Sequence, residues 1–452
     1  MHFTKRRLDR CASHILVATS FLAASGAAAS CSSSEGDGTS ADFHPFDAAP
    51  EAASGDAGGD PPNARDAGRV DAAPLAVVCT SPPCATSLVT TLGAGVDDRS
   101  EGFCALLGDG TVACWGANGA GQLGRGDAAG VVDSANAARV VGLSDVVTLD
   151  HTCAVDKDGA VWCWGTGPFL RSGAGAVTTE RTPVKLDLPP ATKIGLGYTT
   201  ACAAVEGGVH CWGSNATAQL SPLPTNSGDI GLPRSIPLPP GVPVRAFAVG
   251  SATFALREDG TLVTWGANPP LGRPSPIFPD PYPDTVALDG IVMVDLAHDS
   301  ACATAGGTGY CWGAPVRKSV WEQNGSSLDR ALPEPVVTPE PIVQIATTRS
   351  YVIENVGIQR YRWCASTVSG ALYCWGINES GQAGVGTQNY VFDAVKVEGL
   401  PERVAQVKTT PKTTCALLTN GKVYCWGSNY NGQLGNGENR GVSVVPVEVV
   451  LP

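Results

Sequence analysis

A Trp-Gly dipeptide recurs seven times in this chain of 452 residues, about fifty residues apart, and it constrains the fold more than any other feature. In the last copy, Thr414–Leu418 leads through the turn at Gly421 to Val423–Gly427. Two short apolar runs around such a turn predict a β-hairpin, and a period near fifty residues predicts a four-stranded propeller blade. The sequence therefore predicts an all-β fold, a seven-bladed β-propeller. We expect the tryptophans of these dipeptides to pack between blades. The seven copies begin at Trp115, Trp164, Trp212, Trp265, Trp312, Trp375 and Trp426.

The ends of the repeat array suggest how the ring closes. The C-terminal stretch Pro446–Val450 matches internal strands such as Pro183–Leu186 and Ala394–Val397, which each precede the next blade. It has no blade after it, whereas the first blade, opening near Leu88, has no such strand before it. We therefore expect the C-terminal strand to complete the first blade and to hide the exposed sheet edges.

The repeat also contains Cys-Trp-Gly, Asn and Gly-Gln-Leu-Gly elements, as in Cys114–Gly116, Asn118 and Gly121–Gly124. With these elements the chain, from about residue 85 to its end, resembles the regulator of chromosome condensation family of seven-bladed propellers. The resemblance implies a propeller scaffold. The family's nucleotide-exchange role on a small nuclear GTPase would not carry over to an exported chain. Secreted bacterial inhibitors of β-lactamase resemble this architecture and bind protein through one face.

The sixteen cysteines divide by position, and twelve of them form six pairs within the repeats. The turn inside each pair has a length that places the two cysteines opposite each other on paired strands. One blade lacks both, with Phe254 and Thr264 in the two places, as expected for a bonded pair. Zinc is the alternative for paired cysteines, but structural zinc sites space their ligands two to four residues apart. We therefore expect disulfides and no metal, with Cys79 bonded to Cys84, Cys104 to Cys114, Cys153 to Cys163, Cys202 to Cys211, Cys302 to Cys311, Cys364 to Cys374, and Cys415 to Cys425.

Residues 1–30 have the pattern of an export signal, with a basic start, an apolar run over Ile15–Leu22 and a stretch of small residues. The next residue, Cys31, lies in a sequence that resembles the lipobox of bacterial lipoproteins, where the cysteine is acylated and becomes the mature N-terminus. That family usually has Leu where Ala28 stands. The alternative is ordinary cleavage after Ala29, which leaves Cys31 as a free thiol. We expect a lipid anchor at Cys31.

The remaining chain divides into a tether and a domain. Residues 31–78 contain few large apolar side chains, so they are expected to form a disordered tether, and residues 79–452 are expected to form the propeller. The signal and anchor predict a location in the cell envelope, at the outer membrane or in the periplasm, or outside the cell.

Charge and motifs exclude several functions. The formal net charge of -12 disfavours nucleic acid, whose binding depends on Lys and Arg. The Gly119–Gly124 stretch matches a dinucleotide-binding pattern, but the other copies lack its first Gly, so we interpret it as a turn that connects strands. No catalytic motif occurs. We expect no enzyme and no cofactor, but a monomeric scaffold that binds an unknown protein partner. The alternative is an envelope enzyme or glycan-binding protein that uses the central channel.

The longest interval between two repeats, from Trp312 to Trp375, suggests a partner site. It includes an insert rich in the Tyr, Trp and Arg side chains that supply hot spots at protein interfaces. Two interpretations stay open: the side chains form a contact surface, or they fold back and cap the blade. The insert residues are Tyr351, Arg360, Tyr361, Arg362 and Trp363.

Overall fold

The computed structural model describes residues 72–93, 100–127, 130–170, 177–224, 230–268, 270–297, 300–313, 332–349 and 361–452. The chain divides into two units, Met1–Asn63 and Ala64–Pro452. The first unit lies outside the described residues, and the second contains the propeller.

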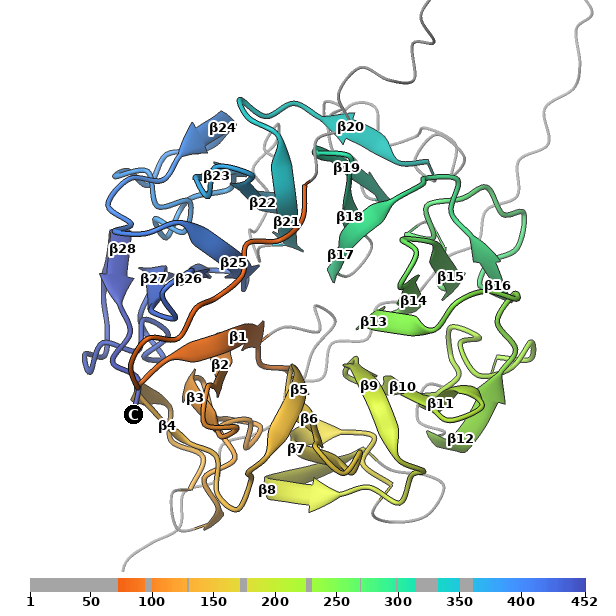
Figure 1. Ribbon diagram of the computed structural model, residues 1–452. Helices are drawn as coiled ribbons and strands as arrows, with labels where there is room; N and C mark the ends of the chain where they lie inside the picture. Colours follow the sequence, from red (N-terminus) through yellow and green to blue (C-terminus); the bar gives the residue numbers. More distant parts are fainter. Residues whose placement is uncertain are drawn as a thin grey trace, which may run out of the picture. The chain divides into compact units, whose positions relative to one another are not determined.

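In the described part of the second unit, seven four-stranded antiparallel sheets form a ring around a central axis, as the sequence predicts (Figure 1). Each sheet is one blade and uses four consecutive strands, with the first strand nearest the centre of the ring. Blades 1 to 3 contain β1 (Ala85–Thr90), β2 (Gly102–Leu107), β3 (Val112–Gly116), β4 (Ser134–Arg139); β5 (Val146–Asp150), β6 (Cys153–Asp156), β7 (Val161–Gly167), β8 (Thr178–Lys185); β9 (Ala191–Leu196), β10 (Thr200–Val205), β11 (Gly208–Ser214), β12 (Ile230–Ile236). Blades 4 to 7 contain β13 (Val244–Val249), β14 (Ala252–Arg257), β15 (Leu262–Gly266), β16 (Asp280–Thr285); β17 (Ile291–Ala297), β18 (Ser300–Ala305), β19 (Thr308–Gly313), β20 (Glu334–Val336); β21 (Ile342–Arg349), β22 (Tyr361–Thr367), β23 (Leu372–Gly376), β24 (Val391–Lys396); β25 (Val404–Thr409), β26 (Thr413–Leu418), β27 (Val423–Ser428), β28 (Val442–Glu448).

Burial explains the sequence pattern of the strands. The second strand of a blade is flanked by other strands and packs against neighbouring blades on both faces, so its side chains are continuously buried, as in β2 and β26. The fourth strand lies at the rim and is largely exposed, as in β8. Proline occurs in several of these rim strands, where a missing N–H does not interrupt a sheet.

The predicted hairpin disulfides are present. In each of the six repeat pairs the two cysteines lie directly opposite each other on the second and third strands, with Cα atoms 4.1 Å apart. The turn residue Gly110 has a φ of 78° and Gly421 a φ of 80°, the left-handed conformation that the three-residue loops require. Cys79 and Cys84 form the seventh disulfide. The six hairpin bonds join Cys104 to Cys114, Cys153 to Cys163, Cys202 to Cys211, Cys302 to Cys311, Cys364 to Cys374, and Cys415 to Cys425.

The predicted closure of the ring is wrong. The C-terminal strand β28 pairs with β27 of its own blade, and blade 1 is completed by β4. The physical reason is local pairing: in every repeat the strand after the Trp-Gly loop returns antiparallel to the strand that contains the second cysteine position. In the first repeat this pairing sets Ala138 opposite Cys114. The ring therefore closes through contacts between two complete blades.

The blades are joined by a repeated tryptophan hydrogen bond. The indole Nε1 of Trp115 donates to the main-chain oxygen of Gln433 at 2.9 Å, and that of Trp164 donates to Gln122 in the same way. Each acceptor lies in the loop between the third and fourth strands of the preceding blade. Six described tryptophans make this contact: Trp115, Trp164, Trp212, Trp265, Trp312 and Trp426. The repeated tryptophans therefore pack between blades, as the sequence indicates.

Residues before the expected boundary at position 79 already contact the ring. Ala72 is buried, Val77 packs against the core of blades 7 and 1, and the Val78 N–H donates to the Thr419 oxygen at 2.8 Å. The ring contacts thus begin several residues earlier than the composition predicts.

Candidate functional site: the long-loop face

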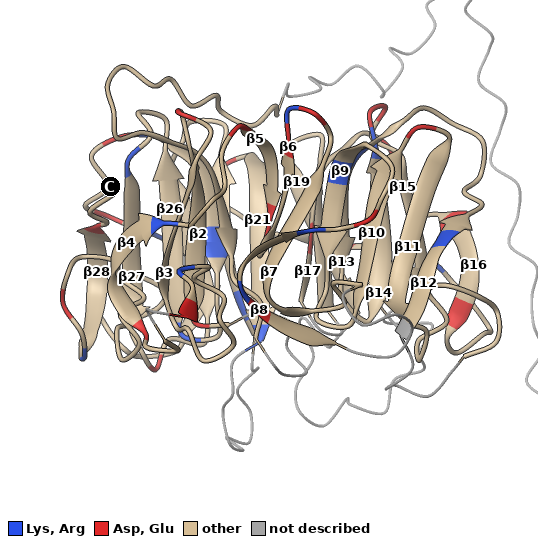
Figure 2. Cartoon of the chain, turned by 90° about the horizontal axis from the view of Figure 1, so that it is seen from below, with Lys and Arg blue, Asp and Glu red and all other residues tan. Residues whose placement is uncertain are grey.

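The ring has two faces of different construction. Because the strands are antiparallel, the loops that join first to second and third to fourth strands lie on one face, which we call the long-loop face. The β2–β3-type hairpins and the connections between blades lie on the other, which we call the hairpin face. Figure 2 shows the ring from the side, with the strands running from one face to the other. The hairpin turns are short, and one of them consists only of residues 206–207. The loops between third and fourth strands are much longer, as in residues 117–133 and 429–441.

In four blades an asparagine side chain holds the base of the loop between the third and fourth strands. In blade 1 the Asn118 Oδ1 accepts the Leu123 N–H at 3.0 Å, and its Nδ2 donates to the Gly130 oxygen. Blades 3, 6 and 7 repeat this with Asn215, Asn378 and Asn429. The Asn and Gly-Gln-Leu-Gly elements are thus a loop clamp, and the dinucleotide-like stretch of blade 1 is a turn, as interpreted from the sequence.

All the exposed leucine, isoleucine and aromatic side chains of the described loops lie on the long-loop face. Leu223 is 79 % exposed, Tyr430 67 % and Phe278 56 %. Val132, Ile277 and Leu332 lie in loops of the same type and are also exposed. In the described connections of the hairpin face, the exposed large apolar residues are all valine: Val78, Val141, Val242, Val337 and Val450. Leucine, isoleucine and aromatic side chains are larger than valine, so each exposed side chain of this type on the long-loop face offers more apolar contact area.

The partner residues expected from the sequence do not form an exposed set. Tyr361, Arg362 and Trp363 lie in β22 and are 7 %, 0 % and 2 % exposed, so a contact surface is the wrong interpretation for these three. Tyr351 and Arg360 lie outside the described residues. Their distance in sequence from the first hairpin cysteine could have predicted this burial. Thr413 and Phe103, which lie two residues and one residue before that cysteine in other blades, are also buried.

The buried insert residues instead hold blades together. The Arg362 Nη2 donates to the main-chain oxygens of Thr410 and Thr413 in blade 7, at 2.8 and 3.0 Å. The Trp363 ring stacks between those of Tyr361 and Trp375, with centroids about 6 Å apart. The two described ends of the insert therefore prolong the β21–β22 hairpin of blade 6, with Arg349 opposite Tyr361.

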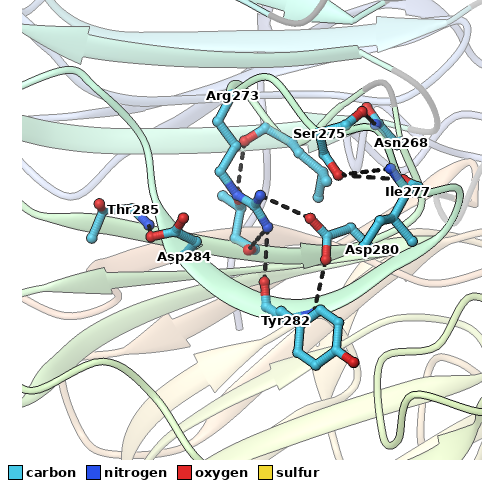
Figure 3. A network of polar contacts seen from close by, with 10 residues as sticks. Asn268, Arg273, Ser275, Ile277, Asp280, Tyr282, Asp284 and Thr285 are labelled. Carbon is cyan, nitrogen blue, oxygen red and sulfur yellow. Dashed lines mark hydrogen bonds and ion pairs between the residues drawn. The ribbon is translucent and has the colours of Figure 1, made fainter.

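Blade 4, which lacks a hairpin disulfide, contains a buried polar network (Figure 3). The Arg273 guanidinium forms an ion pair with Asp280 at 2.8 Å and donates to the main-chain oxygens of Thr264 and Tyr282. Burial acts to raise the pKa of Asp280, but hydrogen bonds from the Tyr282 N–H, Ser275 and Arg273 outweigh it and lower that pKa. The network ties the loop to β15 and β16, at the position where other blades have their second cysteine.

Blade 1 has an arginine at the same place in its loop, Arg125, and its side chain holds the loop to the blade. Its Nη2 donates to the main-chain oxygens of Cys114 and Asn136, both at 2.7 Å. Arg125 follows the loop glycine in blade 1 as Arg273 does in blade 4. The Arg-Gly-Asp tripeptide that begins at Arg125 is thus part of the loop framework.

The Glu101 carboxylate lies on the long-loop face at the junction of blades 7 and 1. It accepts hydrogen bonds from Thr410 Oγ1 and the Lys412 N–H, each at 2.8 Å, and from Thr413 Oγ1. Burial raises the pKa of Glu101, and these hydrogen bonds, with one from Gln433, act in the opposite direction. All the donors come from blade 7, so the carboxylate joins the two blades.

The described residues contain no group of three or more His, Cys, Asp or Glu side chains that could hold a metal ion. Within the same ranges, no helical segment has the length and apolarity that a membrane span needs. A pocket of about 520 Å³ lies on the hairpin face beside the proline-rich connection 237–243. Its buried Arg257 donates to the main-chain oxygens of Pro239 and Pro240, so that side chain fixes the connection.

The fold and the clamped loops define a repeat propeller whose blades share one framework. The model of the regulator of chromosome condensation (RCC1) repeat matches residues 147–169, 404–433 and 420–452. The ultraviolet-B receptor UVR8 of Arabidopsis thaliana is 31% identical over 353 residues, which are 74% of this chain and 77% of that protein. This chain therefore belongs to the RCC1-repeat family.

Other similar proteins differ in length or identity. The human E3 ubiquitin-protein ligase HERC2 is 27% identical over 362 residues, which are 74% of this chain but only 7% of the ligase. Yeast RCC1 (Prp20), in a structure bound to Kap60, has a TM-score of 0.58 at 19% identity, over 76% of this chain and 84% of that one. Human WBSCR16 has a TM-score of 0.56 at 18% identity, over 76% and 94%. These structures share the fold.

Proposed function

We propose that this protein is an exported, lipid-anchored propeller scaffold that binds a protein partner through its long-loop face. The observation that carries the proposal is that Leu223, Phe278 and Tyr430, all largely exposed, lie on loops of this one face, in blades 3, 4 and 7. Asn215 and Asn429 hold the loops of blades 3 and 7, and the Arg273–Asp280 pair holds that of blade 4. A rigid framework with exposed aromatic and aliphatic side chains suits protein binding, since little side-chain and loop entropy is lost on association. Tyr351 and Arg360 stay part of the proposed contact set on sequence grounds. We assign no catalytic role.

The disulfides support export. All fourteen cysteines of the described residues are paired, and structural disulfides persist in oxidising compartments such as the periplasm and the extracellular space. The anchor at Cys31 rests on the sequence, because that residue lies outside the described ranges.

No observation favours the alternative, a channel that binds glycans or catalyses a reaction. Polar side chains of the innermost strands form hydrogen bonds between neighbouring blades: Asp150 accepts the Leu196 N–H at 2.8 Å, and Asp295 accepts the Thr347 N–H at 2.8 Å. These groups stabilise the ring, and the long-loop face is the better candidate.

The face can be tested with matched variants. We expect Leu223→Ser/Phe278→Ser/Tyr430→Ser to abolish cross-linking to the native partner and to leave the melting temperature nearly unchanged, because the three side chains are exposed. The control Val141→Ser/Val242→Ser/Val337→Ser changes the hairpin face and should keep partner binding. Cross-linking lost only in the control would assign the partner to the other face.

The anchor has a separate test. Cys31→Ser, or growth with globomycin, should leave the protein unprocessed, and mass spectrometry of the wild type should find acylated Cys31 as the first residue. An unlipidated N-terminus at Ser30 would disprove the anchor and leave the binding proposal intact.

A further inference from the structure

The Cys79–Cys84 disulfide differs from the other six in its exposure. Each cysteine of the hairpin pairs is at most 1 % exposed, so a reagent in solution cannot reach those sulfur atoms while the blades stay packed. Cys79 is exposed, whereas its partner Cys84 is 5 % exposed. Because thiol–disulfide exchange requires a thiolate to approach a sulfur atom, the two ends of this bond differ in reactivity.

The same disulfide lies where the ring closes. The segment that contains it contacts the hairpin turn of blade 7 on both sides of the bond: the Val78 N–H donates to Thr419, and the Ala85 N–H donates to Gly421 at 2.9 Å. The main-chain oxygen of Cys84 also accepts the Gly108 N–H of blade 1 at 2.9 Å. A Cβ atom on Gly421 would lie 2.1 Å from the Cys84 Sγ, so the disulfide packs directly on that turn. The bond thus fixes a clip between the first and last blades.

A pocket gives access to the exposed end of the bond. It has a volume of about 530 Å³ and is lined by residues 79–84, by Leu107 and Asp109 of blade 1, and by Arg139. The space is large enough for a small thiol such as a tripeptide, so a thiolate can approach the Cys79 end of the bond from this side. Arg139 is paired with Asp109 at 2.7 Å, and both side chains are about half exposed.

We propose that Cys79–Cys84 is a thiol-exchange site that opens the clip at the ring junction. A thiolate of a low-molecular-weight thiol attacks the Cys79 Sγ, the bond to Cys84 breaks, and Cys84 leaves as the thiolate, which then takes a proton. The product is a mixed disulfide on Cys79, so one bond forms, one breaks and no external oxidant is required. A second thiol molecule can release Cys79 and completes the reduction. The proposal does not depend on the partner or the lipid anchor.

The experiment uses the folded full-length protein and reduced glutathione as the probe. The protein is incubated with increasing concentrations of glutathione, free thiols are trapped by alkylation, and the products are identified by peptide mapping. Glutathione should be found on Cys79 at a concentration about tenfold lower than the concentration at which any hairpin cysteine first reacts. In the same samples, amide hydrogen exchange should accelerate at least about tenfold in peptides covering residues 72–85 and 419–422, with the other blades unchanged.

A variant without the bond sharpens the result. Cys79→Ser/Cys84→Ser should show the fast exchange without glutathione and no response to it. Reaction at the hairpin cysteines at the same concentration, attachment to Cys84 rather than Cys79, or unchanged hydrogen exchange after Cys79 has reacted would each overturn the proposal. If the variant does not fold, the titration of the wild type still decides between these outcomes.

Discussion

The junction between blades 7 and 1 and the junction between blades 1 and 2 use the same tryptophan hydrogen bond, but only the second is also joined by the chain. Trp115 and Trp164 each donate to a glutamine oxygen at 2.9 Å. The 7–1 junction adds the Glu101 carboxylate, a 2.6 Å hydrogen bond from Asn431 to Asp133, and the clip at Val78. The 1–2 junction has polar contacts of its own, such as the Asp127–Arg181 ion pair and the hydrogen bond between His151 and the Thr90 oxygen. What distinguishes the 7–1 junction is therefore the clip, which takes the place of the missing chain connection.

The largest expected effect comes from removing the indole at each junction. We expect Trp115→Ala and Trp164→Ala each to lower the free energy of unfolding by about 3–5 kcal/mol, because each leaves a large buried cavity. The loss should be larger for Trp115, since no connecting chain limits the separation of blades 7 and 1. Urea unfolding of both variants gives the difference, and a larger loss at Trp164 would break the comparison.

A smaller, pH-dependent effect should distinguish Glu101. Its pKa is raised in the folded state above the ordinary value of 4.5. The folded protein therefore holds this proton more tightly than the unfolded chain. The resulting stability is fully present below about pH 4.5 and is lost as the pH rises through the raised pKa.

The Glu101→Gln side chain cannot ionise, so the variant does not lose stability as the pH rises through this pKa. We expect the free energy of unfolding of the variant, minus that of the wild type, to increase with pH above about 4.5, by about 1.4 kcal/mol for each unit of the pKa shift. Urea unfolding at several pH values measures the slope. If the difference in the free energy of unfolding were constant or decreased with pH, burial would not raise the pKa of this carboxylate.

The smallest effect concerns the glutamines between inner strands. Gln344 exchanges two hydrogen bonds with Val407, at 2.8 and 3.0 Å, whereas Gln406 accepts one from the Leu88 N–H at 2.9 Å. At about 1 kcal/mol for each hydrogen bond, Gln344→Ala should cost about 2 kcal/mol and Gln406→Ala about 1 kcal/mol. Thermal unfolding of both variants tests the order. The reverse order would mean that the 7–1 junction depends on this contact more than its geometry indicates.

Local signals in the sequence predicted much of the fold. The turn lengths fixed the pairing of cysteines such as Cys202 and Cys211, and the joint loss at Phe254 and Thr264 indicated bonded pairs. The pattern also predicted packing of the tryptophans between blades. It did not identify the loop carbonyl groups that accept their hydrogen bonds, because those groups belong to the preceding repeat.

The errors came from features that a repeat pattern does not encode. The similarity of Pro446–Val450 to earlier strands shows that it is a rim strand but not which blade it joins. Tyr361 and Trp363 have the composition of an interface, and their burial follows from strand register, not from residue type. The exposed side chains of the long-loop face, such as Leu223 and Phe278, have no sequence signal apart from their position in variable loops.

Both ends of the ring's chain meet at the same place, and this has a mechanical consequence. Val78 bonds to the turn of blade 7, and the C-terminal Leu451 packs in the core shared by blades 7 and 1. A pulling force applied through the N-terminal segment therefore loads this junction first and peels the clip away before any other blade is stretched. The hairpin disulfides then limit how far six of the seven blades can extend, because the residues between paired cysteines cannot lengthen under tension, whereas blade 4 has no such limit.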